Sequence, residues 1–278
     1  MRLSKKLLPK KIPRMNKIID ECRSIYKASS FAQENLSFHE TLSYLSEWQG
    51  KSYDPMILPC LTDFERKVIL DSFRRVCEGY PLGYVVGKVW FYKSLFSVRE
   101  GLLIPRCDSE VLVETAVKLI PRQTHFLDLC TGSGCIGLSV LLERSDLTAT
   151  LVDISDTALT VARENAQALG VFDRCRFLKK DLLSDLPKLP EHSAIVMNPP
   201  YLTSDEMKNI PENVRFEPSL ALDGGTDGLV FYRLFEKSDK LMIFEIGSGQ
   251  TDGLFSIYKR GRVVCDLSRN PRVFIINE

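Results

Sequence analysis

The chain contains an apolar run, Phe126-Leu127-Asp128-Leu129, that passes directly into a glycine-rich segment, Cys130-Thr131-Gly132-Ser133-Gly134-Cys135-Ile136-Gly137. The apolar run predicts a buried strand. The glycines permit a sharp turn and close approach of a ligand to the backbone where the next helix begins. Because such a turn also occurs without a ligand, the segment alone leaves a purely structural turn open.

Helices and strands alternate on both sides of this segment. A helix is predicted at 108–120, and a longer one runs from an N-cap at Ser155 to a C-terminal Gly170. Strand–helix alternation requires crossover connections, so it predicts an α/β fold with a mostly parallel sheet covered on both faces. The predicted strands are 126–129, 149–153, 176–178, 194–197 and 241–245, followed by a closing pair at 262–265 and 272–276.

The first part of the chain has a different pattern, that of short amphipathic helices. Capping boxes at Ser37 with Glu40 and at Thr62 with Glu65 predict two helix starts. The β-branched and aromatic residues at 84–98, interrupted by a glycine, predict a β-hairpin. We therefore expect a basic, disordered arm at 1–17, a small α-helical bundle domain at 18–82, a β-hairpin connector at 83–103 and the α/β domain at 104–278.

Charge is nearly balanced, with 37 basic and 36 acidic residues, but unevenly distributed. Residues 1–17 hold seven basic side chains and no acidic one, so 30 basic face 36 acidic residues in the rest. An enzyme that binds duplex nucleic acid is expected to carry a broad basic face, and direct nucleic-acid binding is therefore not expected. The arm is interpreted as a solvated terminus, with attraction to RNA or the ribosome as the alternative.

Other function classes are disfavoured by what the sequence lacks. The eight cysteines form no C-x-x-C pair and the three histidines show no metal-binding spacing, which predicts reduced thiols and no metal site. No apolar run is long enough to cross a membrane, and the start has no secretory apolar core. These features predict a cytoplasmic protein without membrane contact.

Carboxylates follow three successive predicted strands, as Asp128, Asp153 and Asp181. The carboxyl ends of parallel strands border the ligand crevice, so we expect all three side chains to point into it. Asp153 stands 25 residues after Asp128, where an acidic side chain accepts hydrogen bonds from both ribose hydroxyls. Negative charge disfavours a pyrophosphate but suits the sulfonium and ammonium groups of S-adenosylmethionine, which we prefer to a nicotinamide cofactor.

The predicted strand 194–197 is followed directly by Asn198-Pro199-Pro200-Tyr201. A strand-terminating Pro-Pro turn is the structural alternative. Methyl transfer to an amide or aromatic amine needs an aligned nitrogen, and acceptors for both of its N–H bonds would hold it in place. The Asn198 side-chain oxygen and the Pro199 carbonyl are the candidate acceptors. Tyr201 is a candidate to stack on the flat group or to face the cationic donor.

The sequence resembles class I S-adenosylmethionine-dependent methyltransferases of the amino type, and more closely the bacterial release-factor glutamine methyltransferases. The resemblance spans about residues 18–278. Besides the motifs above it takes in Pro81-Leu82-Gly83-Tyr84, Leu103-Ile104-Pro105-Arg106 with Asp108 and Glu110, Arg215-Phe216-Glu217-Pro218, Ala221-Leu222-Asp223-Gly224-Gly225 and Phe244-Glu245-Ile246-Gly247. It implies a Rossmann-like, mostly parallel sheet with an antiparallel last strand.

The activity implied by the resemblance is methylation of the glutamine side-chain nitrogen in the Gly-Gly-Gln loop of class 1 peptide chain release factors. That loop promotes peptidyl-tRNA hydrolysis on the ribosome. The partners would be release factors 1 and 2, docked with help from the helical domain, and the enzyme would act as a monomer. S-adenosylmethionine would be converted to S-adenosylhomocysteine without a metal.

By position, the resemblance also implies roles for individual residues. Catalysis is assigned to Asn198, Pro199 and Tyr201, and glutamine binding to Asn198, Pro199, Pro200 and Tyr201. Pro105 and Arg106 would line the approach to the cofactor, with a structural ion pair as the alternative for Arg106. Cofactor binding is assigned to Cys130, Thr131, Gly132, Ser133, Gly134, Asp153, Asp181, Leu182 and Asn198.

The sequence departs from the family pattern in several places, among them a short stretch after Glu245 and the basic first 16 residues, which extend beyond the pattern. Cys107 stands where the family commonly has a second proline. Only eight residues separate Tyr232 from Leu241, too few for a full crossover helix, which predicts a trimmed last helical layer.

Three alternative functions stay open. They are a glutamine methyltransferase acting on a large-subunit ribosomal protein, an adenine-N6 methyltransferase of nucleic acid, and a translation-factor binding module with a vestigial cofactor site.

Overall fold

The computed structural model describes residues 13–48, 61–185 and 189–278. The chain divides into two compact units between Val86 and Gly87, and each has its own apolar core. Residues 1–12 of the expected basic arm lie outside the described residues. Its last five positions, 13–17, belong to the first helix instead.

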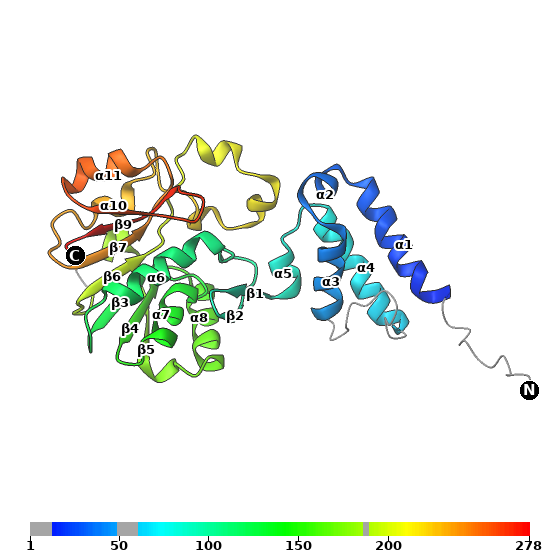
Figure 1. Cartoon of the computed structure of the whole chain (residues 1–278), viewed down its shortest axis with the longest axis horizontal. Coiled ribbons are helices and arrows are strands. Elements are labelled where there is room, and N and C mark those ends of the chain that lie inside the picture. The colour runs from blue at the N-terminus through cyan, green and yellow to red at the C-terminus, as the bar shows by residue number, and fades with distance from the viewer. Residues whose placement is uncertain (1–12, 49–60, 186–188) are drawn as a thin grey trace, which may run out of the picture. The chain divides into compact units, whose positions relative to one another are not determined.

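The first unit consists of helices around a small core that includes Leu45, Ile69 and Phe73. Thr62 forms the predicted capping box: its hydroxyl accepts from the Glu65 N–H at 3.2 Å, and the Glu65 carboxylate accepts from the Thr62 N–H at 2.7 Å. The helices are α1 (Pro13–Ala28), α2 (Ser30–Asn35), α3 (Phe38–Trp48), α4 (Asp63–Cys77) and α5 (Leu82–Val86) (Figure 1).

The predicted hairpin is present but begins later than expected. β1 (Lys88–Phe91) pairs antiparallel with β2 (Ser94–Ser97). The extended structure predicted at 84–86 is wrong, because these residues form α5. The N–H groups of Tyr84 and Val85 both donate to the Pro81 carbonyl, at 3.1 and 3.2 Å. Proline suits the start of a helix, and an apolar run this short fits either conformation.

Among the described residues, the second unit holds a seven-stranded sheet in the order β5-β4-β3-β6-β7-β9-β8 (Figure 1). Neighbours from β5 to β7 are parallel, and β9 is antiparallel to both β7 and β8. The predicted mostly parallel sheet with an antiparallel last strand is therefore confirmed. The strands are β3 (His125–Leu129), β4 (Thr148–Asp153), β5 (Cys175–Lys179), β6 (Ala194–Met197), β7 (Leu241–Glu245), β8 (Arg262–Cys265) and β9 (Pro271–Ile276).

Successive side chains of the strands enter two different apolar layers. Phe126 packs in the layer formed with α6 (Glu110–Leu119), α7 (Cys135–Glu143) and α8 (Asp156–Ala168). Leu127 and Leu129 pack in the opposite layer, with α9 (Leu182–Asp185), α10 (Val230–Arg233) and α11 (Thr251–Tyr258). α10 has 4 residues and α11 has 8, so the predicted trimming of this helical layer is confirmed.

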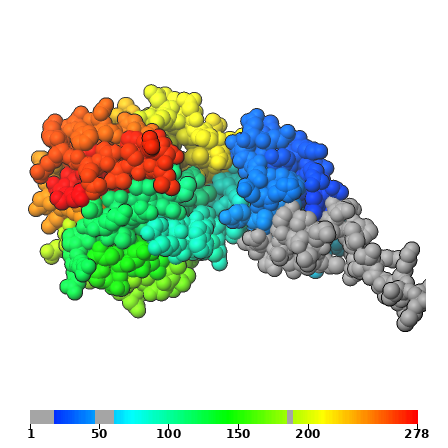
Figure 2. All heavy atoms as spheres, viewed as in Figure 1, coloured from blue at the N-terminus to red at the C-terminus, as the bar shows by residue number. Residues whose placement is uncertain are grey.

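Between β6 and α10 the chain runs through short turns of 3-10 helix that cover one edge of this unit. Figure 2 shows this part in yellow, beside the orange and red C-terminal segments. No helix of the described residues is long and apolar enough to cross a membrane. The 3-10 helices are η1 (Cys107–Ser109), η2 (Phe172–Arg174), η4 (Glu206–Asn209), η5 (Glu212–Phe216) and η6 (Ser219–Ala221).

Candidate active site

Asp128 lies beneath the glycine-rich loop, so the prediction that it points into the crevice is wrong. Strand alternation places it on the α7 side of the sheet, where it is 1% exposed. Its Oδ2 accepts from the Thr131 hydroxyl and, at 3.1 Å, from the Gly137 N–H. A Cβ at Gly137 would lie only 2.6 Å from that oxygen. Burial raises the pKa of Asp128 to about 7, although both hydrogen bonds oppose the shift.

The loop above Asp128 turns through three residues of positive φ. Cys130, Gly132 and Gly134 have φ values of 57°, 54° and 81°, and Gly134 is the N-cap of α7. The Thr131 N–H donates to the Val152 carbonyl at 3.1 Å, which ties the loop to β4. Apart from Gly132 itself and its two chain neighbours, no atom of the described residues lies within 4 Å of a Cβ built on Gly132. The space beside the loop is therefore open to a ligand at a helix N-terminus.

Asp153 ends β4 beside this loop and is held by two backbone donors. The Gly132 N–H donates to Oδ2 and the Ser155 N–H to Oδ1, both at 2.9 Å. Burial raises the pKa of Asp153, and these backbone hydrogen bonds oppose the rise. Each carboxylate oxygen accepts more than one hydrogen bond, so both can also receive ligand hydroxyls. The fixed, two-oxygen acceptor next to open backbone fits the ribose of an adenosine cofactor.

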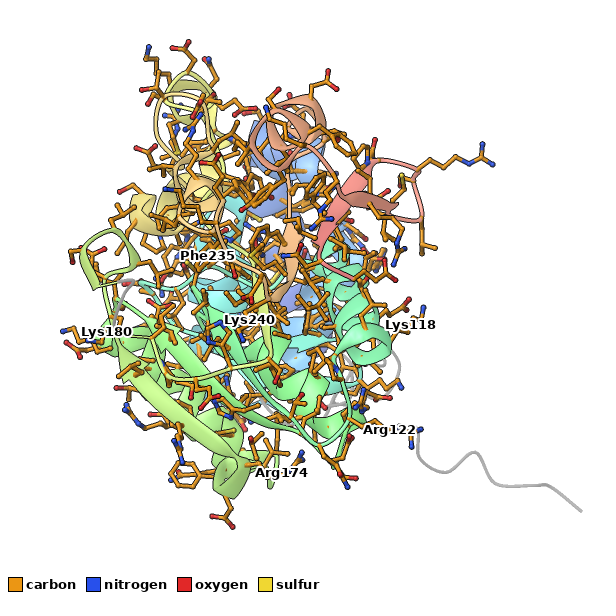
Figure 3. All side chains as sticks on the ribbon, turned by 90° about the vertical axis from the view of Figure 1, so that its left-hand side faces the viewer. Lys118, Arg122, Arg174, Lys180, Phe235 and Lys240 are labelled. Carbon is orange, nitrogen blue, oxygen red and sulfur yellow. The ribbon has the colours of Figure 1, made fainter. Side chains whose placement is uncertain are left out.

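Asp181 and Leu182 follow β5 at the same edge of the sheet. Figure 3 shows Arg174 and Lys180 at opposite ends of β5, and the Lys180 N–H donates to the Asp153 carbonyl at 3.0 Å. The structure thus brings Asp181 and Asp153 to neighbouring strand ends. The Asp181 carboxylate accepts from the Leu183 N–H at 3.0 Å, and Leu182 is buried in the apolar layer.

The Asn-Pro-Pro-Tyr motif follows β6, next to β3 in the sheet, so it lies at the same edge as the glycine-rich loop. Pro199 and Pro200 are buried, and Asn198 and Tyr201 are half-buried. Burial and the nearby Glu245 carboxylate raise the pKa of Tyr201 to about 12, which keeps its hydroxyl neutral. The motif therefore presents an amide and a neutral phenol beside a fixed Pro-Pro backbone.

The backbone after the motif is fixed by a neighbouring loop. The Gln250 amide donates to the carbonyls of Tyr201 and Gly228, at 3.0 and 2.9 Å. Gly228 has a φ of 72°, and a Cβ there would clash with the backbone carbonyl oxygen of Tyr201. At Gly224 a Cβ would lie 2.7 Å from the Pro200 oxygen. Glycine is required at both positions for this close approach, which accounts for Gly224 and Gly228 of the 221–229 segment.

Arg106 forms an ion pair with Glu217, whose side chain is 2% exposed. The other oxygen of Glu217 accepts from the Ile104 N–H at 3.0 Å. The structural ion pair considered for Arg106 is therefore present. It joins the segment before α6 to the segment that follows η5.

Two residues that the sequence interpretation gave no role lie next to Asn198. The Asn198 amide nitrogen is 3.4 Å from the Ser109 hydroxyl, and Ser109 is near enough to Glu245 to lower the pKa of that carboxyl group. Glu245 is 2% exposed, and burial raises its pKa to about 7. The sequence signal that could have identified Glu245 is an acidic residue at the end of an otherwise apolar strand, since an acid is rarely buried without a partner.

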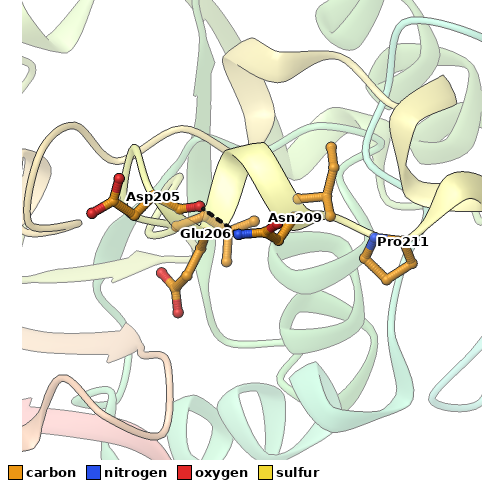
Figure 4. Close-up of a pocket in the computed structure, with 6 residues that line it drawn as sticks. Asp205, Glu206, Asn209 and Pro211 are labelled. Carbon is orange, nitrogen blue, oxygen red and sulfur yellow. Dashed lines mark hydrogen bonds between the residues drawn. The ribbon is translucent and has the colours of Figure 1, made fainter.

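A shallow pocket of about 420 Å³ lies on the segment that follows the motif (Figure 4). Just before η4, the Thr203 N–H donates to the Glu206 carboxylate at 2.8 Å, and the Glu206 N–H donates to the Thr203 hydroxyl at 3.2 Å. The predicted site residues do not line this pocket, so it is separate from the predicted cofactor site. It is lined by Leu202, Asp205, Glu206, Asn209, Ile210 and Pro211.

Across 13–48, 61–185 and 189–278, no group of three or more histidine, cysteine or acidic side chains is arranged to hold a metal ion. The cysteines of these ranges are free thiols, buried at Cys22, Cys77 and Cys135 and exposed at Cys107 and Cys265. Burial raises the pKa of Cys77 to about 11.

Known proteins with similar sequences are methyltransferases. The Methyltransferase small domain family matches residues 107–218. A release factor glutamine methyltransferase from Moorella thermoacetica is 39% identical over 218 residues, which cover 72% of this chain and 76% of that protein. A ribosomal protein uL3 glutamine methyltransferase from Francisella tularensis is 38% identical over 198 residues, 67% of this chain but only 63% of that protein.

A solved structure also has a similar fold. The hMettl16 catalytic domain in complex with MAT2A 3'UTR hairpin 6 is 15% identical, with a TM-score of 0.51, and the match covers 77% of this chain and 81% of that one. At this identity the likeness concerns the fold alone.

Proposed function

The chain belongs to the release factor glutamine methyltransferase family, and we propose that it methylates the side-chain amide nitrogen of the glutamine in the Gly-Gly-Gln motif of class 1 peptide chain release factors. The observation that carries the proposal is the position of Asn198-Pro199-Pro200-Tyr201 at the sheet edge that also holds Asp153 and the glycine-rich loop. A flat amide held there would lie next to a bound methyl donor.

The cofactor site is proposed to consist of the loop 130–134 with Asp153, Asp181, Leu182 and Asn198. Bound S-adenosylmethionine would supply an electrophilic methyl group. Asp153 would accept from the ribose hydroxyls, because both of its oxygens are fixed by backbone N–H donors. The open space beside Gly132 would admit the methionine part, and Asp181 with Leu182 would border the adenine. No metal is required for this arrangement.

The acceptor amide is proposed to be held by the Asn198 side-chain oxygen and the Pro199 carbonyl, one for each N–H bond. Holding both hydrogens aligns the nitrogen and disfavours its conjugated, unreactive geometry. Pro199 suits this role because its φ is fixed and it carries no competing N–H. Tyr201, neutral at physiological pH, would cover the flat group as an aromatic surface. No side chain is assigned as a general base, since the product amide cation is acidic enough to lose its proton to water.

The other parts of the chain are proposed to serve recognition. Residues 18–82 would dock the release factor, residues 83–103 would connect the two domains, and residues 104–278 would bind the cofactor and catalyse methyl transfer. Release factors 1 and 2 would both be substrates of a monomeric, cytoplasmic enzyme without direct nucleic-acid contact. The basic residues within 1–12 lie outside the described part of the chain.

A glutamine methyltransferase acting on a ribosomal protein is the second candidate, favoured by the 38% identity to the uL3 enzyme. That match covers less of its relative than the match to the release factor enzyme does. The acceptor chemistry would be the same in both cases.

The test is incubation with labelled S-adenosylmethionine and, separately, release factor 1, release factor 2, ribosomal protein uL3 and adenine-containing RNA or DNA, followed by peptide mapping. We expect label on the glutamine of the Gly-Gly-Gln peptide. We also expect Asn198→Ala to bind the cofactor normally but to lose about a hundredfold or more in turnover. Label confined to uL3 would support the second candidate, and near-normal turnover by Asn198→Ala would contradict the proposed site.

A further inference from the structure

Asn198 can serve as an acceptor only if its side-chain amide is oriented. An asparagine side chain carries a donor NH₂ and an acceptor oxygen of nearly the same shape, so an unrestrained amide can rotate to present either. The wrong rotamer would place a donor against the substrate N–H and repel it. The orientation must therefore come from neighbouring groups.

Ser109 is one such neighbour. It occupies the N-cap position of α6, where a serine hydroxyl ordinarily accepts from the backbone of the first helical turn. Here the side chain makes no capping hydrogen bond, and the residue is only 2% exposed. Its hydroxyl lies 3.4 Å from the Asn198 amide nitrogen. That distance is at the long end of the hydrogen-bond range, as is common at sites without a bound substrate.

Glu245 fixes the direction of the hydroxyl. The carboxylate is buried at the end of β7, and the Ser109 hydroxyl lowers its pKa, which is the effect of a hydrogen-bond donor that faces a carboxylate. A serine that donates to a carboxylate has only its lone pairs left, so it must accept from Asn198. Within the part of the chain that the structure describes, the second oxygen, Oε2, has no hydrogen-bond partner.

The charged residues near Glu245 do not change the direction of the hydrogen bond between Ser109 and Glu245. Arg272 lowers the pKa of Glu245 and Asp108 raises it, and Arg272 itself is bonded at 3.1 Å to Asp108 and Asp266. Protonation on Oε2 leaves Oε1 as an acceptor for Ser109. The hydrogen-bond direction is therefore the same for the charged and the neutral carboxyl group.

We propose that Ser109 and Glu245 are positioning residues that orient the Asn198 amide. The Glu245 carboxylate accepts from Ser109, Ser109 accepts from the Asn198 NH₂ group, and the Asn198 oxygen is thereby directed to the substrate amide. This inference rests on the proposed function for its consequence in catalysis, but the orientation of Asn198 is a property of the protein itself.

The test compares Ser109→Ala and Ser109→Cys with the wild-type chain. The cysteine variant keeps the side-chain size but replaces the hydroxyl with a weak hydrogen-bonding group. Ser139→Ala is the matched control, because Ser139 is 1% exposed and its hydroxyl has no partner among the described residues. Each full-length variant is measured for kcat and KM with a release factor, for cofactor affinity by calorimetry, and for the Asn198 side-chain amide resonances after ¹⁵N-asparagine labelling, assigned with Asn198→Ala.

For both Ser109 variants we expect kcat to fall about tenfold to a hundredfold, with unchanged cofactor affinity and shifted or broadened Asn198 amide resonances. Ser139→Ala should retain the wild-type kcat and resonances. Either a kcat within twofold of wild type or unmoved Asn198 resonances in Ser109→Cys would overturn the inference. Failure of the wild-type chain to label a release factor would instead refute the proposed function, and the resonances would still report the orientation.

Discussion

Replacing Gly137 by alanine is expected to destabilise the second unit, although the residue lies inside a helix. In an unconstrained helix interior the same change gains about 1 kcal/mol. In this structure the new Cβ would lie 2.6 Å from Oδ2, 2.9 Å from Cβ and 3.0 Å from Cγ of Asp128. Asp128 has little room to move, because its Cβ is attached to the buried strand β3.

Two costs outweigh the gain in helix propensity. Overpacking a well-packed interior costs about 1–3 kcal/mol. Displacing the Asp128 carboxyl group also weakens its hydrogen bonds from Thr131 and Gly137, each worth about 1.5–3 kcal/mol when one partner is charged. We expect a net loss of about 2–4 kcal/mol after partial relaxation of the loop. In a unit of this size, each kcal/mol lowers the melting temperature by about 2–4 °C.

Scanning calorimetry of the full chain measures the change, and titration with S-adenosylmethionine measures whether the loop above Asp128 still binds. Gly249→Ala is the control, because its Cβ would meet no atom of the described residues within 4 Å and its φ is not positive. It should leave stability unchanged or raise it by up to about 1 kcal/mol. A Gly137→Ala protein that melts at or above the wild-type temperature would refute the reasoning.

Three further outcomes are expected. Asp153→Asn should weaken S-adenosylmethionine binding by roughly 10- to 100-fold in a calorimetric titration, because an NH₂ group would oppose one of the two backbone donors; a change below threefold would contradict the ribose assignment. In a urea titration, Arg106→Ala should lower the free energy of unfolding by about 1–3 kcal/mol, because buried Glu217 loses its cation. The control Arg99→Ala removes one partner of an ion pair that is exposed on both sides, and it should cost under about 1 kcal/mol. The proton on Glu245 stabilises the folded state fully below about pH 4.5, and this contribution to stability is lost as the pH rises through about 7. Glu245→Gln should therefore gain stability relative to wild type across that interval, and parallel pH profiles of the free energy of unfolding for the two proteins would contradict this expectation.

The regular elements of the second unit could be predicted because local signals agreed with the tertiary structure. The strand Ala194–Met197 was predicted with its observed bounds, since an apolar run ends at Asn198 and two prolines. The predicted N-cap at Ser155 is observed, with its hydroxyl accepting from the Ala158 N–H at 3.3 Å. At 84–86 the same kind of signal failed, because three β-branched or aromatic residues carry too little periodicity to distinguish strand from helix.

The candidate site could be predicted only in part. The sequence placed Asp153 and Asn198 at strand ends, and parallel pairing brings those ends to one edge. The direction of Asp128 depends on its packing against Gly137, and the contact of Ser109 with Asn198 joins residues 89 positions apart. Contacts this distant in the sequence leave no periodic signal within any short window.

The place of β9 in the sheet has a consequence for biosynthesis. This strand is the last of the described strands in the sequence, yet it lies between β7 and β8 and pairs with both. While residues 271–276 are still inside the ribosome, β7 has an open edge and β8 has no neighbour among the described strands. Chains fold from the N-terminus as they emerge. The seven-stranded sheet is thus completed only when residues 271–276 have emerged, after all of its other strands.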